Sequence, residues 1–204
     1  PSTYVPGSAV PLVLDIHGYT GTSNAQAATS GFRAVSDAEN FIVAYPQGVG
    51  NSWNAATFCC GDARAAGLDD VGLAVAIVDA ISAEFAIDSE RVYATGLSNG
   101  GALAHRIACE ASEVFAATAP VAFPLGLLPL SACQPSRPIT VAHFHGIGDT
   151  VVPYDGTFWA PASQSSFSSW AEKNQCEGAP VSDGPCETYT QCADGVETTL
   201  CSLD

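Results

Sequence analysis

Positive charge and long hydrophobic runs are both scarce in this sequence. Six Lys and Arg residues stand against 21 Asp and Glu, which gives a net charge of −15 at pH 7. Nucleic acids and anionic lipid surfaces attract positively charged proteins, so neither is expected as a partner, and a neutral substrate is favoured. The longest apolar candidate, residues 116–130, is interrupted by three prolines and is shorter than the roughly 20 residues of a membrane-spanning helix. We therefore expect no insertion into a membrane.

The sequence also lacks the basic segment and apolar core of a signal peptide at its start, so any export signal is expected to have been removed already. Eight cysteines are present, and none has the paired spacing that is typical of zinc ligands. Such cysteines indicate disulfide bonds and an oxidising compartment. We therefore expect a secreted, extracellular protein.

The cysteines fall into two groups, with Cys59, Cys60, Cys109 and Cys133 in the body of the chain and Cys176, Cys186, Cys192 and Cys201 near its end. We expect disulfide bonds within each group. The adjacent Cys59 and Cys60 are expected to bond to two distant partners rather than to each other, because neighbouring residues rarely reach disulfide geometry.

Short apolar runs alternate with helical patterns along a chain whose length and 47% hydrophobic content suit one domain, residues 1–204, and a monomer. The runs predict strands over 10–16, 41–46, 91–95, 115–122 and 139–146, and a β-hairpin at 188–200. Helices are predicted within 22–40, 69–85 and 163–174 and directly after Ser98, with Asp69 or Asp70 capping the helix at 69–85. This alternation predicts an α/β fold, a mostly parallel sheet with helices on both faces.

A serine surrounded by glycines follows the third predicted strand, in the stretch GLSNGG at 96–101. Glycine has no side chain to collide with nearby backbone, so the spacing indicates a sharp strand-to-helix turn that exposes Ser98 at the top of the sheet. Ligands of parallel sheets bind beyond the carboxyl ends of the strands. In this architecture the loop after the first strand and the residue after the serine supply an oxyanion hole, which assigns backbone amide donors to Tyr19 and Asn99.

Several ordered stretches, from about Tyr4 to the end of the chain, carry a resemblance: PLVLDIHGYTG, GFRAVSDAENFIVAYPQGVGNSWN, CCG, DDVG, RVYATGLSNGGALAHRIACE and FHGIGDTVVPYDG. Together they resemble secreted α/β-hydrolase esterases of the poly(3-hydroxybutyrate) depolymerase-like, feruloyl esterase and acetylxylan esterase group (carbohydrate esterase family 1). The resemblance implies an α/β-hydrolase fold and ester hydrolysis, with Ser98 as nucleophile and Asp149 as triad acid. It implies no metal or organic cofactor. Asp155 is the alternative acid.

The sequence departs from the family at the triad histidine, which in the family follows the last core strand in a glycine-rich turn. No histidine follows Asp149, and the strands that precede the His-Gly loop in the family are reduced to PSTYVP. The chain is therefore expected to be the central part of a longer protein, incomplete at both ends.

None of the four histidines present is an obvious replacement. His105 lies about two helical turns beyond Ser98, roughly 10 Å along the axis, which is too far for a general base, so we expect it to pack or to lie at the surface. His143 and His145 share one face of a strand, where they either form core hydrogen bonds or hold a metal. His17 is expected to shape the oxyanion loop rather than to act as the base.

Two functions are consistent with these residues. The first is a carboxylic ester hydrolase acting on feruloyl or acetyl esters of plant polysaccharide, or on short polyesters such as poly(3-hydroxybutyrate). The second is a catalytically inactive esterase-like fragment or binding protein without the triad histidine; a peptidase is a weaker third possibility. Trp53 and Trp159 are expected to contact the substrate, although packing explains a tryptophan equally well. The leucine-rich segment 124–130 either caps the entrance or packs on the sheet.

Overall fold

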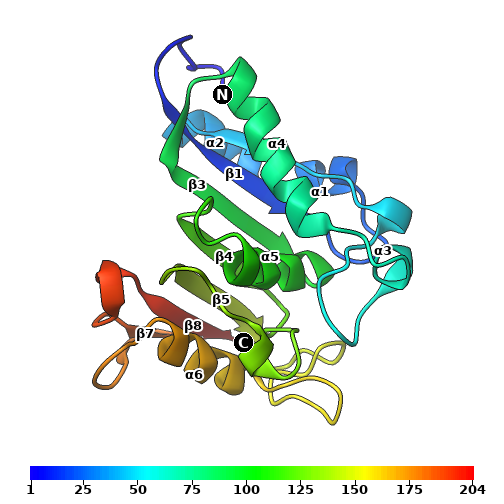
Figure 1. Ribbon diagram of the computed structural model, residues 1–204, viewed down its shortest axis with the longest axis vertical. Helices are drawn as coiled ribbons and strands as arrows, with labels where there is room; N and C mark the ends of the chain where they lie inside the picture. Colours follow the sequence, from blue (N-terminus) through cyan, green and yellow to red (C-terminus); the bar gives the residue numbers. More distant parts are fainter.

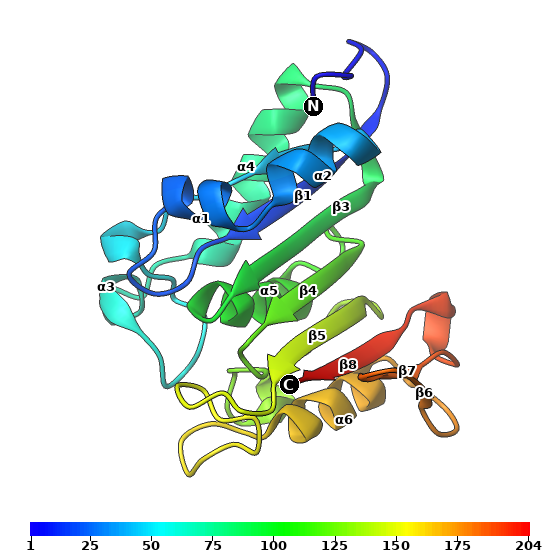
Figure 2. The same cartoon turned by 180° about the vertical axis from the view of Figure 1, so that it is seen from behind.

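The computed structural model describes all 204 residues, and its strands form one eight-stranded sheet (Figures 1 and 2). The sheet order is β2-β1-β3-β4-β5-β8-β7-β6; neighbours from β2 to β8 are parallel, whereas β7 and β6 are antiparallel to their neighbours. The strands are β1 (Val10–Ile16), β2 (Ile42–Ala44), β3 (Ile87–Leu97), β4 (Ala117–Val121), β5 (Thr140–Gly146), β6 (Val181–Asp183), β7 (Cys186–Tyr189) and β8 (Thr198–Leu203).

Helices lie on both faces of this sheet. They are α1 (Ser23–Thr29), α2 (Phe32–Glu39), α3 (Gly61–Ala65), α4 (Asp70–Glu84), α5 (Asn99–Glu110) and α6 (Ser163–Lys173), with short 3₁₀ turns at Val49–Asn51, Leu130–Ala132 and Ala193–Gly195. Figure 1 shows α4, α5 and α6 across one face, and Figure 2 shows α1 and α2 across β1 and β2 on the other. The predicted α/β fold with a mostly parallel sheet is therefore confirmed. None of these helices is long and apolar enough to cross a bilayer.

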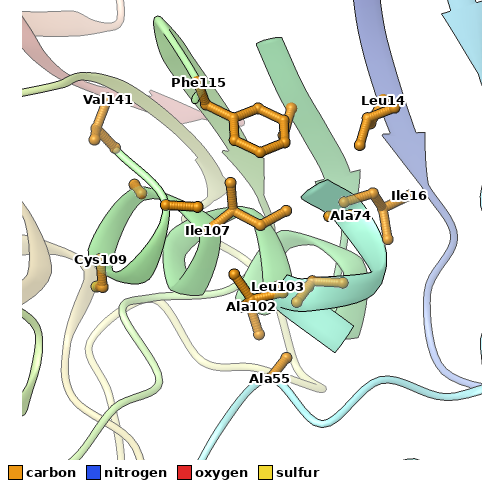
Figure 3. Close-up of a cluster of buried hydrophobic side chains, with 14 of the residues drawn as sticks. Leu14, Ile16, Ala55, Ala74, Ala102, Leu103, Ile107, Cys109, Phe115 and Val141 are labelled. Atoms are coloured by element: carbon orange, nitrogen blue, oxygen red, sulfur yellow. The ribbon is translucent and has the colours of Figure 1, made fainter. Parts of the chain in front are cut away.

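The main core lies between the sheet and α5 (Figure 3). Ten of the twelve residues of α5 are buried, and Leu103 and Ile107 pack there with Leu14 and Ile16 of β1 and with Phe115. Glycine and alanine occupy much of this helix, so its backbone approaches β3 and β4 closely. Burial on this scale fixes the position of the residue that precedes the helix, which is Ser98.

Three elements differ from the sequence prediction. The helix expected within 22–40 is divided into α1 and α2, because Gly31 adopts a left-handed φ of 77° between them. The β-hairpin expected at 188–200 is larger: β7 pairs with β8, and β8 also joins the parallel sheet beside β5. Helix α3 forms inside the segment 47–67, for which the sequence predicted neither a helix nor a strand.

The cap predicted for the helix at 69–85 is present. Asp69 is the N-cap of α4, and its carboxylate accepts a hydrogen bond from the Gly72 amide at 2.8 Å. Asp70 instead accepts from the Asn54 amide at 2.6 Å and is buried. Of the two candidates, Asp69 therefore caps the helix, and Asp70 ties its first turn to the loop after β2.

All eight cysteines form disulfides, and each bond joins members of the same predicted group: Cys59–Cys60, Cys109–Cys133, Cys176–Cys192 and Cys186–Cys201. The prediction that Cys59 and Cys60 bond to distant partners was wrong. Cys109 and Cys133 lie 4.9 Å apart at Cα and bond to each other, so no distant thiol remains for the adjacent pair. The peptide bond between Cys59 and Cys60 is cis, with the Cα atoms 3.1 Å apart.

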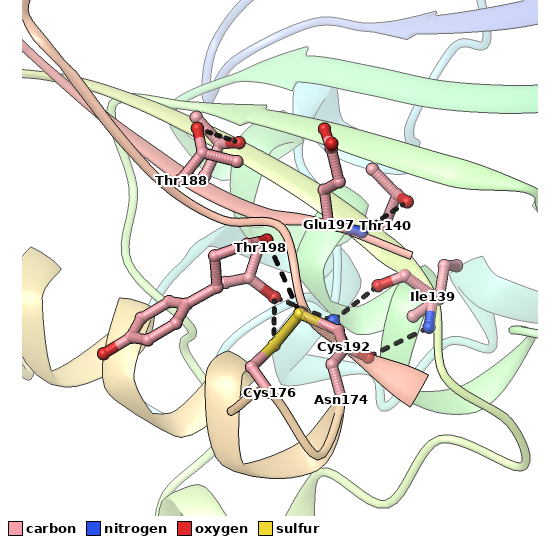
Figure 4. Close-up of a disulfide and its surroundings, with 10 residues drawn as sticks. Ile139, Thr140, Asn174, Cys176, Thr188, Cys192, Glu197 and Thr198 are labelled. Atoms are coloured by element: carbon pink, nitrogen blue, oxygen red, sulfur yellow. Dashed lines mark hydrogen bonds between the residues drawn. A yellow bond between two sulfur atoms is a disulfide. The ribbon is translucent and has the colours of Figure 1, made fainter. Parts of the chain in front are cut away.

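The end of α6 is tied to the sheet beside one of these disulfides (Figure 4). The Asn174 side chain is fully buried, accepts from the Ile139 amide at 3.0 Å, and donates to the Ile139 carbonyl at 2.8 Å and to Thr198 Oγ1 at 2.9 Å. Cys176 and Cys192 form their disulfide next to this network. One buried amide therefore joins α6 to the starts of β5 and β8.

Candidate active site

Ser98 occupies a sharp turn between β3 and α5, as the glycine spacing predicted. Its backbone has φ 55° and ψ −119°, and its amide donates to the Val121 carbonyl at the end of β4 at 2.8 Å. A Cβ on Gly96 would lie 2.8 Å from the Ile16 carbonyl oxygen, and one on Gly100 would lie 2.6 Å from that of His17. Side chains at these two positions would therefore displace β1 or open the turn.

The carboxyl ends of the parallel strands meet around this serine. Ile16 pairs with Gly96, Leu97 with Val121, and Val121 with Phe144, so the ends of β1, β3, β4 and β5 are in register. Ser98 itself is partly exposed. The loops that follow these strands gather at the same edge of the sheet (Figure 1).

Two backbone amides near Ser98 have no hydrogen-bond acceptor in the structure. A Cβ added to Gly18 would lie 3.5 Å from Ser98 Cβ, which places the next residue, Tyr19, beside the serine, and no acceptor contacts the Tyr19 amide. Asn99 is the first residue of α5, so its amide has no acceptor within the helix. The Asn99 side chain is occupied: it accepts from the Trp53 amide at 2.7 Å and donates to the Trp53 carbonyl at 3.1 Å.

Asp149 lies in the turn that follows β5. Its Oδ1 accepts from the amides of Val151 at 2.8 Å and Val152 at 2.9 Å, which fixes the carboxylate, and its Oδ2 lies 3.6 Å from His145 Nε2. Strand β5 is two positions from β3 in the sheet, a separation of about 10 Å at the usual strand spacing. Ser98 and Asp149 follow these two strands and therefore lie at the same edge of the sheet. Asp155, the alternative acid, is exposed, and no hydrogen bond orients its carboxylate.

Comparison with known proteins identifies the family of the chain. Residues 2–125 match the family model described as Esterase PHB depolymerase. The chain belongs to this family. It is 31% identical, over all of its length, to feruloyl esterase B of Piromyces equi, and 37% identical, over 74% of its length, to the putative esterase NocK of Nocardia uniformis subsp. tsuyamanensis.

The chain spans 40% and 44% of the length of these two relatives. Among solved structures, an acetyl xylan esterase from Aspergillus awamori superposes with a TM-score of 0.69 at 19% identity, covering 98% of this chain and 85% of that one. A likeness at that identity shows the fold alone, which is that of the α/β-hydrolases.

All four histidines of the chain are buried at 2% exposure or less. His17 ties two loops together: its Nδ1 donates to the Gly18 carbonyl at 2.8 Å, and its Nε2 accepts from the Gly48 amide at 3.1 Å. Burial lowers the pKa of His17, which keeps the ring neutral. Both ring nitrogens are engaged, so His17 positions the loop that carries Tyr19, as predicted.

The other three histidines form a buried chain between α5, β5 and α6. The Trp170 indole donates to His105 Nδ1 at 3.0 Å, and His143 Nε2 lies 3.2 Å from His145 Nδ1. His145 Nε2 donates to the Val152 carbonyl at 2.8 Å, so this ring supports the turn that holds Asp149. No group of three potential ligands is arranged to hold a metal. The core hydrogen-bonding interpretation of His143 and His145 is confirmed, and His105 is a packing residue.

The tryptophans predicted to contact substrate differ in burial. Trp53 is 1% exposed, donates its indole N–H to the His17 carbonyl at 2.8 Å and packs on the His17 ring. Such burial leaves no surface for a substrate, so the prediction for Trp53 was wrong, and its role is to hold the loop after β1. Trp159 is partly exposed, with its ring 5.3 Å from that of Phe58. Sequence reasoning missed Phe58, since no periodic pattern marks a residue in a long loop.

A surface hollow of about 790 Å³ lies away from the Ser98 turn. It lies between the segment around Leu130 and helix α6, is lined mainly by Ser and Gln side chains, and includes neither Ser98 nor Asp149. The leucine-rich segment 124–130 is divided in its packing: Leu125 is fully buried and Leu128 is 39% exposed. At least its first part packs against the body of the protein, because Ser166 of α6 also accepts from the Leu125 amide at 2.9 Å.

Proposed function

We propose that this chain carries the nucleophile, acid and oxyanion hole of a secreted serine esterase. Ser98 attacks the ester carbonyl, the amides of Tyr19 and Asn99 stabilise the oxyanion, and Asp149 orients the general base. Water then releases the acyl group from Ser98. The observation that carries the proposal is the backbone of Ser98, held at φ 55° between unoccupied amides and a fixed carboxylate.

The proposed substrates are carboxylic esters linked to a polymer: feruloyl or acetyl esters of plant polysaccharide, or short polyesters. The family model and the feruloyl esterase of Piromyces equi support this range. A net charge of −15 supports a neutral substrate. Four disulfides and no free cysteine support an extracellular location, and the buried core supports a monomeric domain.

The general base is the component that the four histidines do not supply. Each is buried and is held by hydrogen bonds or packing away from the solvent edge. The position from which the family resemblance expects the base follows β8. It lies beside the acid turn, because Leu203 pairs with Gly146 and its carbonyl accepts from the Ile147 amide at 2.8 Å. A histidine at that position could reach Asp149.

Hydrolysis of p-nitrophenyl butyrate by the 204-residue chain and by its Ser98→Ala variant tests the proposal. Without a histidine base, the expected rate is lower than that of a complete triad by several orders of magnitude, yet above the rate of the variant. After the protein-free reaction of imidazole with the ester is subtracted, added imidazole should raise the rate of the chain and leave that of Ser98→Ala unchanged, because it supplies a base to a prepared nucleophile. Ser8→Ala, at an exposed position near the start of the chain, is the matched control.

The burial of all four histidines favours one second candidate, an ester-binding protein without catalysis. Equal rates for the chain and Ser98→Ala, with and without imidazole, would remove the esterase proposal and leave this one. Binding of substrate esters to the chain would then be its remaining activity.

A further inference from the structure

Three aromatic side chains from three separate loops meet at the carboxyl edge of the sheet. Phe58 follows β2, Phe123 follows β4, and Trp159 follows β5. The rings of Phe58 and Phe123 stack with centroids 5.7 Å apart and planes 9° apart, whereas Phe58 and Trp159 lie at 5.3 Å and 60°. Phe123 is 1% exposed, and the other two remain partly exposed. The buried Phe123 ring therefore supports Phe58, and Phe58 in turn contacts Trp159.

The segment 58–61 places this cluster beside the nucleophile. At one end, Phe58 stacks on Phe123, two residues beyond Val121, whose carbonyl accepts from the Ser98 amide at 2.8 Å. At the other end, a Cβ added to Gly61 would lie 2.8 Å from Cε2 of Tyr19. The segment thus bridges the two loops that flank Ser98. The Cys59–Cys60 disulfide lies between these two contacts.

The angle between Phe58 and Trp159 suits a flat ligand. An aromatic ring that stacks on the face of one residue meets the other edge-on, and both arrangements are favourable for aromatic pairs. An acetyl group has no ring to place there, and an aliphatic hydroxyacyl chain gains only nonspecific contact. We propose that Phe58 and Trp159 form the acyl-binding wall of the site and select esters of aromatic acids, of the hydroxycinnamoyl kind, over acetyl and aliphatic esters. This proposal rests on the proposed function, because it takes Ser98 as the point of attack.

Binding measured by calorimetry tests the wall without requiring turnover. The protein carries Ser98→Ala to prevent hydrolysis, and the two probes are methyl ferulate and a linear trimer of 3-hydroxybutyrate. Phe58→Leu and Trp159→Leu, each added to this background, keep an apolar side chain against the neighbouring rings but remove the aromatic face. We expect each to weaken methyl ferulate binding about tenfold, the scale of one lost aromatic pair together with its contact area, and trimer binding less than twofold.

The matched control is Phe85→Leu. Phe85 is exposed and packs edge-on against Tyr4, in the loop before β3 and thus at the opposite edge of the sheet. It should leave the binding of both probes unchanged. Circular dichroism and the melting temperature confirm that each variant is folded.

The proposal would be overturned if methyl ferulate binding to the Ser98→Ala protein were undetectable. It would also be overturned if Phe58→Leu weakened methyl ferulate binding no more than Phe85→Leu does. Equal weakening of both probes would also overturn it, because the effect would not depend on the aromatic ring. These results are distinct from failure of the proposed function, which is measured by Ser98-dependent hydrolysis of p-nitrophenyl butyrate in protein with the wall intact.

Discussion

Buried neutral histidines should make this fold sensitive to mildly acidic pH. His105 of α5 is fully buried against Trp170, and burial lowers its pKa to about 3, compared with about 6.5 for an exposed histidine. Burial, and then the neighbouring rings of His105 and His145, also hold the pKa of His143 well below its usual value. Both rings gain a proton on acidification only when the protein unfolds.

The magnitude follows from proton linkage. Between pH 6.5 and the folded-state pKa, the unfolded chain binds a proton that the folded chain does not, so the free energy of unfolding falls as pH falls. The slope is about 1.4 kcal/mol per pH unit for each such histidine. From pH 7 to pH 5, His105 alone accounts for a loss of about 2 kcal/mol, a large part of the roughly 5–15 kcal/mol that stabilises a typical protein.

Two buried carboxyl groups act in the opposite direction. Burial raises the pKa of Asp15 and of Asp70 above the usual value of 3.8, so the folded state takes up these protons before the unfolded state does. Their effect opposes that of the histidines and grows toward the acid end of the range. Measurement between pH 5 and pH 7 therefore isolates the histidines best.

Urea unfolding at pH 7, 6 and 5, with the disulfides intact, measures the effect. His105→Gln keeps a side-chain oxygen that can accept from the Trp170 indole but does not titrate. It should lower stability at pH 7 and lose about 2 kcal/mol less than the unmodified chain on going to pH 5. Thr118→Val, a buried change with no titrating group, should keep the original pH dependence. Parallel curves for His105→Gln and the unmodified chain would refute the reasoning.

Three further outcomes are expected. Gly100→Ala should lower the free energy of unfolding by more than about 2 kcal/mol, because its methyl group would overlap the carbonyl oxygens of Ile16 and His17. Gly146→Ala, with open space around it, should lower it far less. Similar urea midpoints for the two variants would argue against the close contact at Gly100. Asn174→Ala should cost about 3 kcal/mol in the same assay, since it leaves the buried amide and carbonyl of Ile139 without partners, and a loss under about 1 kcal/mol would contradict that role. Asp149→Asn is to be made in a form of the protein that carries a histidine base after β8, and hydrolysis of p-nitrophenyl butyrate is measured without added imidazole. The Ser98-dependent rate should fall by about 10⁴-fold, and an unchanged rate would exclude Asp149 as the acid.

The features predictable from sequence are those set by local pattern. The apolar run at 10–16 and the helical spacing after Asp69 each determine an element whatever surrounds it, and both are present with nearly the predicted bounds. The turn at Ser98 is recognisable from its local glycine pattern, although the contacts that require two of these glycines come from Ile16 and His17 at the end of β1.

Features set by distant contacts were not predictable. The sequence is equally consistent with Trp53 as a pocket wall or as a core residue. Its place in the core depends on the His17 carbonyl, 36 positions away, which accepts a hydrogen bond from its indole. The bond between Cys59 and Cys60 depends on Cys109 and Cys133 having met across a separation of 24 residues. Phe58 and Trp159 are about a hundred positions apart, and only the folded chain brings their rings together.

Unusual backbone conformations gather in the loops around Ser98. Among non-glycine residues with positive φ, most are Asn, Asp or Gln, residues common at helix ends and turns; the exceptions are Thr20, Ser98 and Ala122. These three follow β1, β3 and β4, the adjacent strands whose ends surround the proposed nucleophile. Each such conformation costs of order 1–3 kcal/mol and persists only where the surrounding structure enforces it. The proposed role of Ser98 gives a reason for strain at these positions, because an exposed nucleophile beside two free amides requires the chain to turn sharply around it.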